Sequence, residues 1–145
     1  MIRVLALVIA AFSASSAIAG ELEDELFEDL LVPASEVKLD EYKWKKRLLL
    51  VFADSELDPQ FIEQRRLLSE RPQYLADRDV LVVLDTDPSE QTELREEYRP
   101  RGFGLLLVGK DGETYLRKPV PWAVREISRS IDKLPMRQRE IRSGS

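Results

Sequence analysis

The chain has 145 residues, and 22 Lys and Arg stand against 27 Asp and Glu, which gives a formal net charge of −5. It contains no Cys and no His, so disulfides, thiolate chemistry and the commonest transition-metal ligands are excluded. The acidic balance provides no electrostatic attraction for nucleic acid. The length predicts one domain that is large enough to bury a core.

Residues 1–19 have the pattern of a secretory signal peptide. Arg3 provides a basic start, residues 4–12 are apolar and uncharged, and Ala17-Ile18-Ala19 forms a small-x-small cleavage pattern before Gly20. A transmembrane anchor is the alternative, but the uncharged stretch is marginal for spanning a bilayer. We therefore expect cleavage between Ala19 and Gly20, export to the periplasm or medium, and no stable membrane anchor after cleavage.

Residues 20–37 predict an acidic N-terminal arm or helix. Leu22, Leu26 and Leu30 recur at helical spacing among six acids, and Pro33 is expected to stop the helix. A helix or frayed arm docked on the domain is favoured over an amphipathic helix that binds a partner, because so short a helix needs a surface for stability. Since residues 133–145 are basic, we also expect this tail to meet the acidic segment within one chain.

Residues 38–142 alternate buried strands with helices, and residues 143–145 form a tail. Uninterrupted apolar runs predict strands at 48–52, 80–84 and 103–108. The turn at 109–112, with its Asp-Gly pair, predicts a hairpin to a returning strand at 114–116. Helices are expected after Pro59, over 90–98 and from Pro121, and Pro135 is expected to end the last of them.

The resulting element order is β-α-β-α-β-β-α. It predicts an α/β fold with a mixed four-stranded sheet and helices on both faces. The first two crossovers are expected to be parallel and right-handed, and the last two strands to form an antiparallel hairpin. This order resembles the thioredoxin fold.

Two features that thioredoxins use for redox chemistry are missing here. The first strand leads into Asp54-Ser55-Glu56-Leu57-Asp58-Pro59 without any thiol, and Gly104 stands where the resemblance places a cis-proline. Thiol–disulfide exchange and thiol peroxidase activity are therefore excluded by the chemistry of the side chains.

A closer resemblance covers about residues 38–142. It is carried by Trp44 and Arg47 before the first strand, by Gly109-Lys110-Asp111-Gly112, and above all by the segment Asp132-x-x-Pro135-Met136-Arg137 with Glu140. These residues resemble P-DUDES, a peroxiredoxin-like domain of unknown function that occurs in small exported bacterial proteins. The resemblance implies a thioredoxin-like fold and an extracytoplasmic location. It implies no established activity and no catalytic residues.

The main candidate site is a rim of carboxylates at the carboxyl ends of the first two strands, where open α/β sheets bind ligands. Such a rim could hold a hard divalent cation, although helix capping explains the same residues and is the favoured interpretation. Its five members are Asp54, Glu56, Asp58, Asp85 and Asp87. No metal ligand, cofactor or catalytic residue is assigned from it.

Trp44 has two possible roles, which differ in whether its ring is buried or exposed. It stands in the basic run 43–47, where an aromatic ring could plug the end of the sheet or form a partner-docking patch. The first is favoured by residue statistics.

The sequence as a whole favours an exported, non-redox thioredoxin-like module that binds another exported protein rather than nucleic acid. The alternative is a divalent-cation-dependent hydrolase that uses the acidic rim. No cofactor is expected, and the sequence does not fix the oligomeric state.

Overall fold

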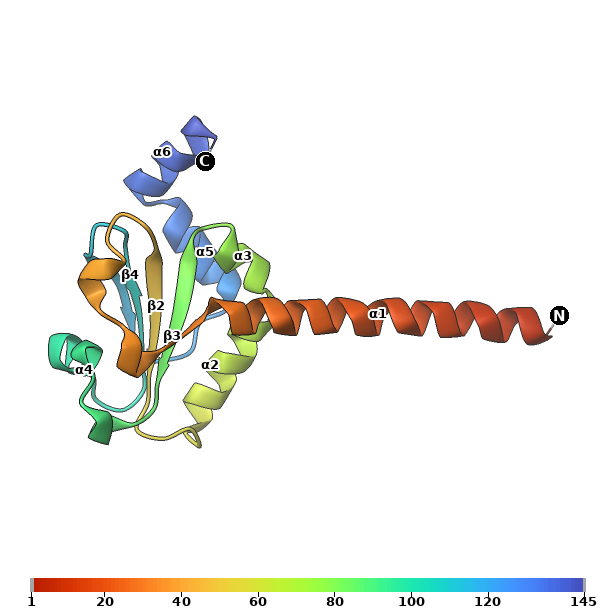
Figure 1. The fold of residues 1–145 in the computed structure, drawn as a ribbon, viewed down its shortest axis with the longest axis horizontal. Helices are drawn as coiled ribbons and strands as arrows, with labels where there is room; N and C mark the ends of the chain where they lie inside the picture. Colours follow the sequence, from red (N-terminus) through yellow and green to blue (C-terminus); the bar gives the residue numbers. More distant parts are fainter. Residues whose placement is uncertain (1, 145) are drawn as a thin grey trace.

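The computed structural model describes residues 2–144 and places a five-stranded sheet at the centre of the protein (Figure 1). The strands are β1 (Leu31–Pro33), β2 (Arg47–Phe52), β3 (Val80–Asp85), β4 (Gly104–Val108) and β5 (Thr114–Lys118). Their spatial order is β1-β3-β2-β4-β5. All six residues of β2 are buried, as expected for a central strand covered on both faces.

Two apolar layers cover the sheet. One face packs against α1 (Ile2–Leu30), α2 (Pro59–Glu70), α3 (Pro72–Ala76) and α5 (Val124–Asp132). The opposite face packs against the 3₁₀ helices η1 (Ala34–Glu36) and η2 (Leu39–Glu41) and against α4 (Glu93–Tyr98). A third 3₁₀ helix, η3 (Pro88–Glu90), and a C-terminal helix, α6 (Pro135–Ser143), complete the fold. The predicted fold class, with helices on both faces of a mixed sheet, is therefore confirmed.

The sheet contains one strand more than the sequence predicted. The N-terminal helix ends at Leu30 rather than at Pro33, and residues 31–33 pair with β3 in parallel as β1. Three residues are too few to show an alternating or continuous apolar pattern, and their strand conformation depends on the exposed edge of β3.

The direction of the second crossover was also predicted wrongly. β2 and β3 are parallel, but β4 runs antiparallel to β2. A parallel crossover must carry the chain back along the whole sheet. Because α4 has only six residues, the chain instead enters β4 at the edge where β3 ended. The predicted antiparallel hairpin of β4 and β5 is confirmed.

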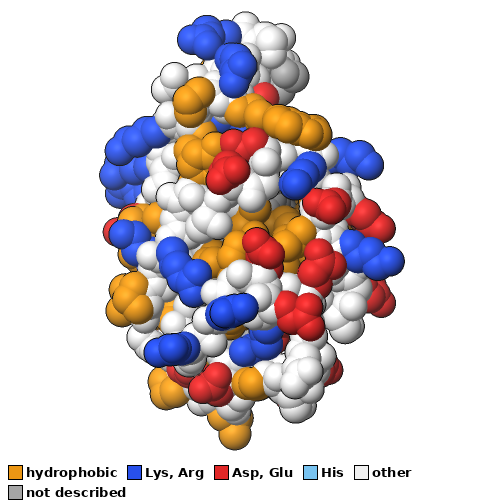
Figure 2. Space-filling view, turned by 90° about the vertical axis from the view of Figure 1, so that its left-hand side faces the viewer, with side chains coloured by type: hydrophobic (Ala, Val, Ile, Leu, Met, Phe, Trp, Pro, Cys, Tyr) orange, Lys and Arg blue, Asp and Glu red, His pale blue; other side chains and the backbone are white. Residues whose placement is uncertain are grey.

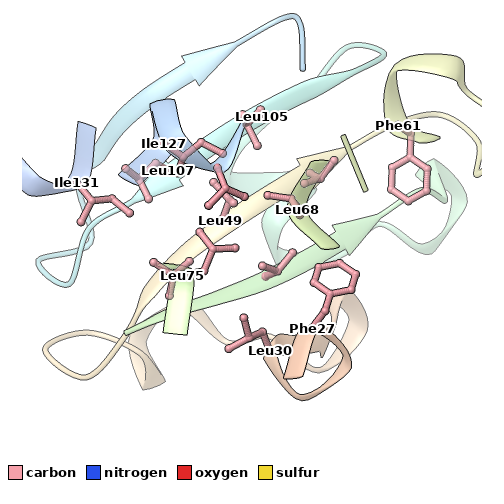
Figure 3. Packing of buried hydrophobic residues seen from close by; sticks show 14 of the residues in the cluster. Phe27, Leu30, Leu49, Phe61, Leu68, Leu75, Leu105, Leu107, Ile127 and Ile131 are labelled. Carbon is pink, nitrogen blue, oxygen red and sulfur yellow. The ribbon is translucent and has the colours of Figure 1, made fainter. Parts of the chain in front are cut away.

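The N-terminal segment belongs to the core of the protein. Phe27 and Leu30 near the end of α1 are buried in the same apolar layer as Leu75 of α3 and as Ile127 and Ile131 of α5 (Figure 3). Beyond them, Ala34 and Val37 are buried against the other face of the sheet. The earlier part of α1 projects away from the body (Figure 1).

The predicted contact between the acidic and basic segments is absent from the described ion pairs. Glu28 of α1 pairs with Arg65 of α2 at 3.3 Å, whereas Arg137 of α6 pairs with Asp132 at 3.5 Å and with Glu140 at 3.4 Å. The helix expected from Pro121 does end before Pro135, since α5 stops at Asp132, but the sequence did not predict the additional helix α6. Pro135 occupies the first position of α6, where the backbone N–H that proline lacks would have no partner within the helix.

Over residues 16–144, whose side chains the structure describes, no helix has the length and apolarity that crossing a bilayer requires.

Candidate functional site

The carboxyl end of β2 carries the loop where a thioredoxin would hold its thiols. Here, Asp58 accepts a hydrogen bond from the backbone N–H of Gln60 at 2.8 Å, which caps α2, and Pro59 occupies the first helical position. The Ser55 hydroxyl accepts a hydrogen bond from the Leu57 N–H at 3.1 Å. The loop is therefore an ordinary helix start, and no Cys occurs in the chain.

Asp85 of the predicted rim is a buried structural residue. Its carboxylate accepts hydrogen bonds from Arg95 Nε at 2.8 Å and from the Thr92 hydroxyl at 2.7 Å. The same guanidinium donates from Nη2 to the Ala53 carbonyl at 2.8 Å and lies over the Phe52 ring. Asp85 thus fixes α4 to the end of the sheet, since a buried carboxylate needs such partners.

The remaining rim carboxylates do not come together as a metal site. Asp87 caps η3 by accepting from Ser89 N–H at 2.9 Å and from the Ser89 hydroxyl at 2.6 Å. These bonds, led by the hydroxyl, lower the pKa of Asp87 below its ordinary value. Asp54 and Glu56 are exposed. Among the described residues, no group of three carboxylates is arranged to hold a metal ion.

The position that resembles the cis-proline of thioredoxins is also unlike that family. Gly104 is the first residue of β4 and pairs with Phe52 of β2. None of the peptide bonds in the described part of the chain is cis. Both features that would define a redox site at this end of the sheet are therefore replaced by structural contacts.

A buried ion network occupies the opposite end of the sheet. Arg47, at the start of β2, has a side chain only 1% exposed, and it donates from Nη1 and Nη2 to the two carboxylate oxygens of Glu140, both at 3.2 Å. Its Nη1 also donates to the Arg78 carbonyl at 2.9 Å. Lys110 Nζ donates to Glu140 at 2.7 Å and to Asp79 at 2.8 Å.

A second branch of the network joins the last two helices to the loop before β3. Arg78 donates two bonds of 2.9 Å to Asp132 at the end of α5. Arg137 of α6 contacts Asp132 at 3.5 Å and Glu140 at 3.4 Å. Lys46 also pairs with Asp79, at 3.9 Å. The network therefore ties α5 and α6 to the central strands, and its cations outnumber its acids.

The carboxyl groups of this network are held in their charged form. Burial alone would raise the pKa of Glu140, but hydrogen bonds from Lys110 and Arg47 and their positive charges outweigh it and lower the pKa to about 2. The hydrogen bonds from Arg78 lower the pKa of Asp132 in spite of its partial burial. Both carboxylates are therefore ionised at neutral pH.

Much of this network coincides with the residues that carry the P-DUDES resemblance. Arg47, Lys110, Asp132, Arg137 and Glu140 are distant in sequence and meet in one cluster. Sequence reasoning did not assign Arg78 and Asp79 to it. Those two precede β3 in a turn, where Asp79 adopts a φ of 53°, and no motif distinguishes them from other polar turn residues.

Trp44 lies on the surface at the same end of the molecule. Its side chain is 69% exposed, so the predicted plug at the end of the sheet is wrong. Its backbone has a φ of 68°, a conformation that bulky residues rarely adopt. The Trp44 N–H donates to the Lys110 carbonyl at 2.7 Å, which ties the strained residue to the ion network.

Met136 and Arg139 of α6, together with Asp111 and Trp44, line a shallow groove beside the ion network. Lys and Arg side chains gather at the α6 end and along one side of the face shown in Figure 2, whereas acids lie mainly along the other side. An exposed aromatic ring, a methionine and cations therefore occur together at one end of an acidic protein.

The order and pairing of the strands define an α/β protein with a thioredoxin-like fold, and its sequence contains no Cys. Residues 38–140 match the family described as Domain of unknown function (DUF4174). This match covers most of the chain, which therefore belongs to that family. A search of curated proteins found no match.

Solved structures confirm the fold. The reduced 2-Cys peroxiredoxin of Plasmodium vivax matches with a TM-score of 0.58 and 15% identity over 71% of this chain and 85% of that chain. Thioredoxin peroxidase I of Plasmodium yoelii matches with a TM-score of 0.53 and 17% identity, over 75% of this chain and 82% of that chain. Reduced desulfothioredoxin from Desulfovibrio vulgaris Hildenborough matches with a TM-score of 0.53 and 14% identity, over 72% of this chain and 96% of that chain.

Proposed function

We propose that this protein is an exported binding module that contacts a partner protein through the end of the sheet at Trp44. The observation that carries this proposal is Trp44 itself, an aromatic side chain 69% exposed on a left-handed backbone. Strained conformations persist where the surrounding structure imposes them, and they concentrate at functional sites. Exposed Trp residues are also enriched among the residues that dominate binding energy.

The charge around Trp44 indicates the kind of partner. Lys43, Lys45 and Lys46 flank it in sequence, and Arg139 lies across the groove. Opposite charges across an interface accelerate association and select the partner. An exported protein that presents an acidic surface fits this end of the molecule, whereas the net charge of −5 argues against nucleic acid.

The rigid base of this surface supports a binding role. Trp44 donates to the Lys110 carbonyl, and Lys110 is held in turn by Asp79 and Glu140. A side chain whose backbone is already fixed loses less conformational entropy on binding. The ion network thus acts as the support of the surface rather than as a catalytic centre.

Export forms part of the same proposal. The signal-peptide pattern of residues 1–19 and the resemblance to exported P-DUDES proteins both support it. The proposed cleavage point between Ala19 and Gly20 lies on an exposed stretch of α1, ahead of the buried Phe27. Expression of the full chain in a bacterial host should yield an extracytoplasmic product whose intact mass corresponds to a start at Gly20; a cytoplasmic product starting at Met1 would contradict export.

The binding role is tested by comparing immobilised mature protein with a Trp44→Ala variant in extracts of the native envelope. We expect the wild type to retain a discrete protein that the variant loses, and that retention should weaken as salt is raised. Leu57→Ala is the matched control, because Leu57 is an exposed apolar side chain at the other end of β2. Equal capture by wild type and Trp44→Ala would refute the proposed surface.

A further inference from the structure

A cavity of about 380 Å³ lies at the end of the sheet opposite to Trp44. It forms where the loop after α4 leads into β4 and where β5 ends. Gly104, one of its lining residues, pairs with Phe52 at the last position of β2, whereas Trp44 precedes the first position of that strand. The cavity shares no lining residue with the groove at Trp44. It is therefore a separate site.

Four cations line this cavity, and none of its lining residues is an acid. They are Arg99, Arg101 and Arg117, which are exposed, and Lys118, which is half-buried. None of the four forms an ion pair with any residue that the structure describes. Their charges are therefore accessible to a ligand from solvent.

Elsewhere on the molecule, clustered cations are accompanied by acids. The larger groove between α1 and α2 also contains arginines, but Asp24, Glu28 and Glu56 line it as well, and Glu28 pairs with Arg65 at 3.3 Å. In the ion network, Lys110 is held by two acids. A recess lined by charges of one sign concentrates ligands of the opposite sign. In a chain whose net charge is −5, the uncompensated cations of this cavity therefore indicate an anionic ligand.

Two of the cations are already held in place. Arg117 donates from Nη2 to the Tyr98 carbonyl at the end of α4, at 2.9 Å. A guanidinium carries five N–H groups, so most of its donors remain for a ligand. The ammonium of Lys118 lies 4.6 Å from the centre of the Trp122 ring, which is a cation–π contact. Groups that are fixed before binding lose less conformational entropy when a ligand arrives.

The lining indicates a phosphate ester among possible anions. Guanidinium groups pair with both carboxylate and phosphate, but a phosphate monoester carries about −1.5 to −2 charges and three acceptor oxygens, and so compensates several cations at once. The lining also has an apolar part, formed by Pro100, Phe103, Leu106 and Pro119. Since a water molecule takes up roughly 30 Å³ of liquid, the cavity has room for the carbon part of an ester beside the phosphate.

We propose that this cavity binds the phosphate group of a phosphate monoester, held by the guanidinium groups of Arg101 and Arg117. Arg99 and Lys118 add positive charge, and the carbon part of the ester contacts Phe103. The monoester is either a soluble small molecule or a lipid headgroup, because both present the same charged group. The site does not depend on the proposed partner surface, which lies at the other end of β2.

Phenyl phosphate is the probe for this site. It is titrated into ¹⁵N-labelled mature protein at constant ionic strength, and the amide signals of Gly102 and Gly104 are followed. We expect both to shift and saturate, whereas the amide of Gly112, in the hairpin at the other end of β4, should not move. Arg101→Gln should weaken the affinity about threefold, as expected for an exposed charge. Arg129→Gln, the matched loss of an exposed Arg on α5, should leave it unchanged.

The pH dependence of binding distinguishes phosphate from other anions. The chain has no His, and a phosphate monoester takes its second negative charge near pH 6, so the ligand rather than the cavity titrates between about pH 5 and pH 7. The affinity for phenyl phosphate should rise about fivefold over this range, the effect of one further charge contact in water. Benzoate, which has the same ring, should bind more weakly and show no such rise. A flat profile for phenyl phosphate, or equal affinity for benzoate, would overturn the proposal.

Vesicles distinguish the two sources of the phosphate. Vesicles of equal parts phosphatidic acid and phosphatidylcholine are sedimented with wild type and with Arg101→Gln. Cosedimentation that the variant loses identifies a lipid headgroup, whereas binding of phenyl phosphate without cosedimentation identifies a soluble molecule. If neither probe binds, or if Arg129→Gln weakens binding as much as Arg101→Gln, the proposal is wrong. None of these outcomes depends on partner capture at Trp44.

Discussion

Removing the negative charge of Glu140 should destabilise the protein strongly. The Arg47 side chain is 1% exposed, that of Lys110 10%, and that of Glu140 16%. In Glu140→Gln, the two cations keep a neutral acceptor but lose the charge that compensates their burial. Breaking a buried ion pair from one side costs about 3–5 kcal/mol, and the residual exposure of Glu140 places this case near 3 kcal/mol.

This loss is measured by urea unfolding of the mature protein at pH 7, followed by circular dichroism. The matched control is Glu70→Gln, which removes an exposed Glu that pairs with Arg66 on α2 and should change stability by less than about 1 kcal/mol. If Glu140→Gln costs no more than Glu70→Gln, the network does not hold α6 to the sheet, and the reasoning fails.

Four further predictions follow from the structure. The pKa of Glu140 is lowered from 4.5 to about 2, so its stabilising contribution is complete above the unfolded-state pKa and is lost as pH falls toward 2. The difference in unfolding free energy between wild type and Glu140→Gln should therefore close between about pH 5 and pH 2. A difference that stays constant in acid unfolding would count against the assigned ionisation. Asp85→Asn should cost about 3 kcal/mol because it strands Arg95, whose side chain is 10% exposed, and a loss no greater than that of exposed Asp54→Asn would show that the pair is not structural. Phe27→Ala should cost about 3–5 kcal/mol because Phe27 is 3% exposed in the main core, whereas an unchanged urea midpoint would mean that α1 does not dock. Trp44→Ala should change stability by less than about 0.5 kcal/mol because the ring is largely solvated, and a large loss in the same assay would indicate a packing role instead.

The sequence predicted those elements whose signals are local. Apolar runs identified β2, β3 and β4, and the Asp-Gly turn identified the hairpin of β4 and β5. The cap at Asp58 with Pro59 correctly located the start of α2. Each of these signals lies within a few neighbouring residues, so no knowledge of the tertiary structure was required.

The errors occurred where distant parts of the chain decide the conformation. β1 has three residues and forms because the edge of β3 is available. Pro135 is compatible with both the end and the beginning of a helix, and α6 forms where Arg137 and Glu140 join the ion network. The antiparallel direction of β4 depends on whether the segment with α4 is long enough to return the chain to the start of the sheet. The periodicity of apolar residues does not contain that information.

The predictions of site residues were likewise incomplete where distant parts of the chain meet. Sequence reasoning placed the carboxylates of the rim at one edge but could not show that Arg95, ten residues beyond Asp85, neutralises it. The resemblance pointed to Arg47, Lys110 and Glu140, yet their meeting in one network depends on the tertiary fold. Likewise, Trp44 is exposed and has a left-handed backbone, and its residue type would suggest neither.

The most direct test of the proposed function is site-specific photocrosslinking in the native envelope. A photoreactive phenylalanine analogue replaces Trp44 in one strain and Leu57 in another, since both side chains are exposed and they lie at opposite ends of β2. We predict a discrete crosslinked product, containing an acidic exported protein, from position 44 and none from position 57. A product from position 57 alone would contradict the account and would place binding at the edge where thioredoxins carry their thiols.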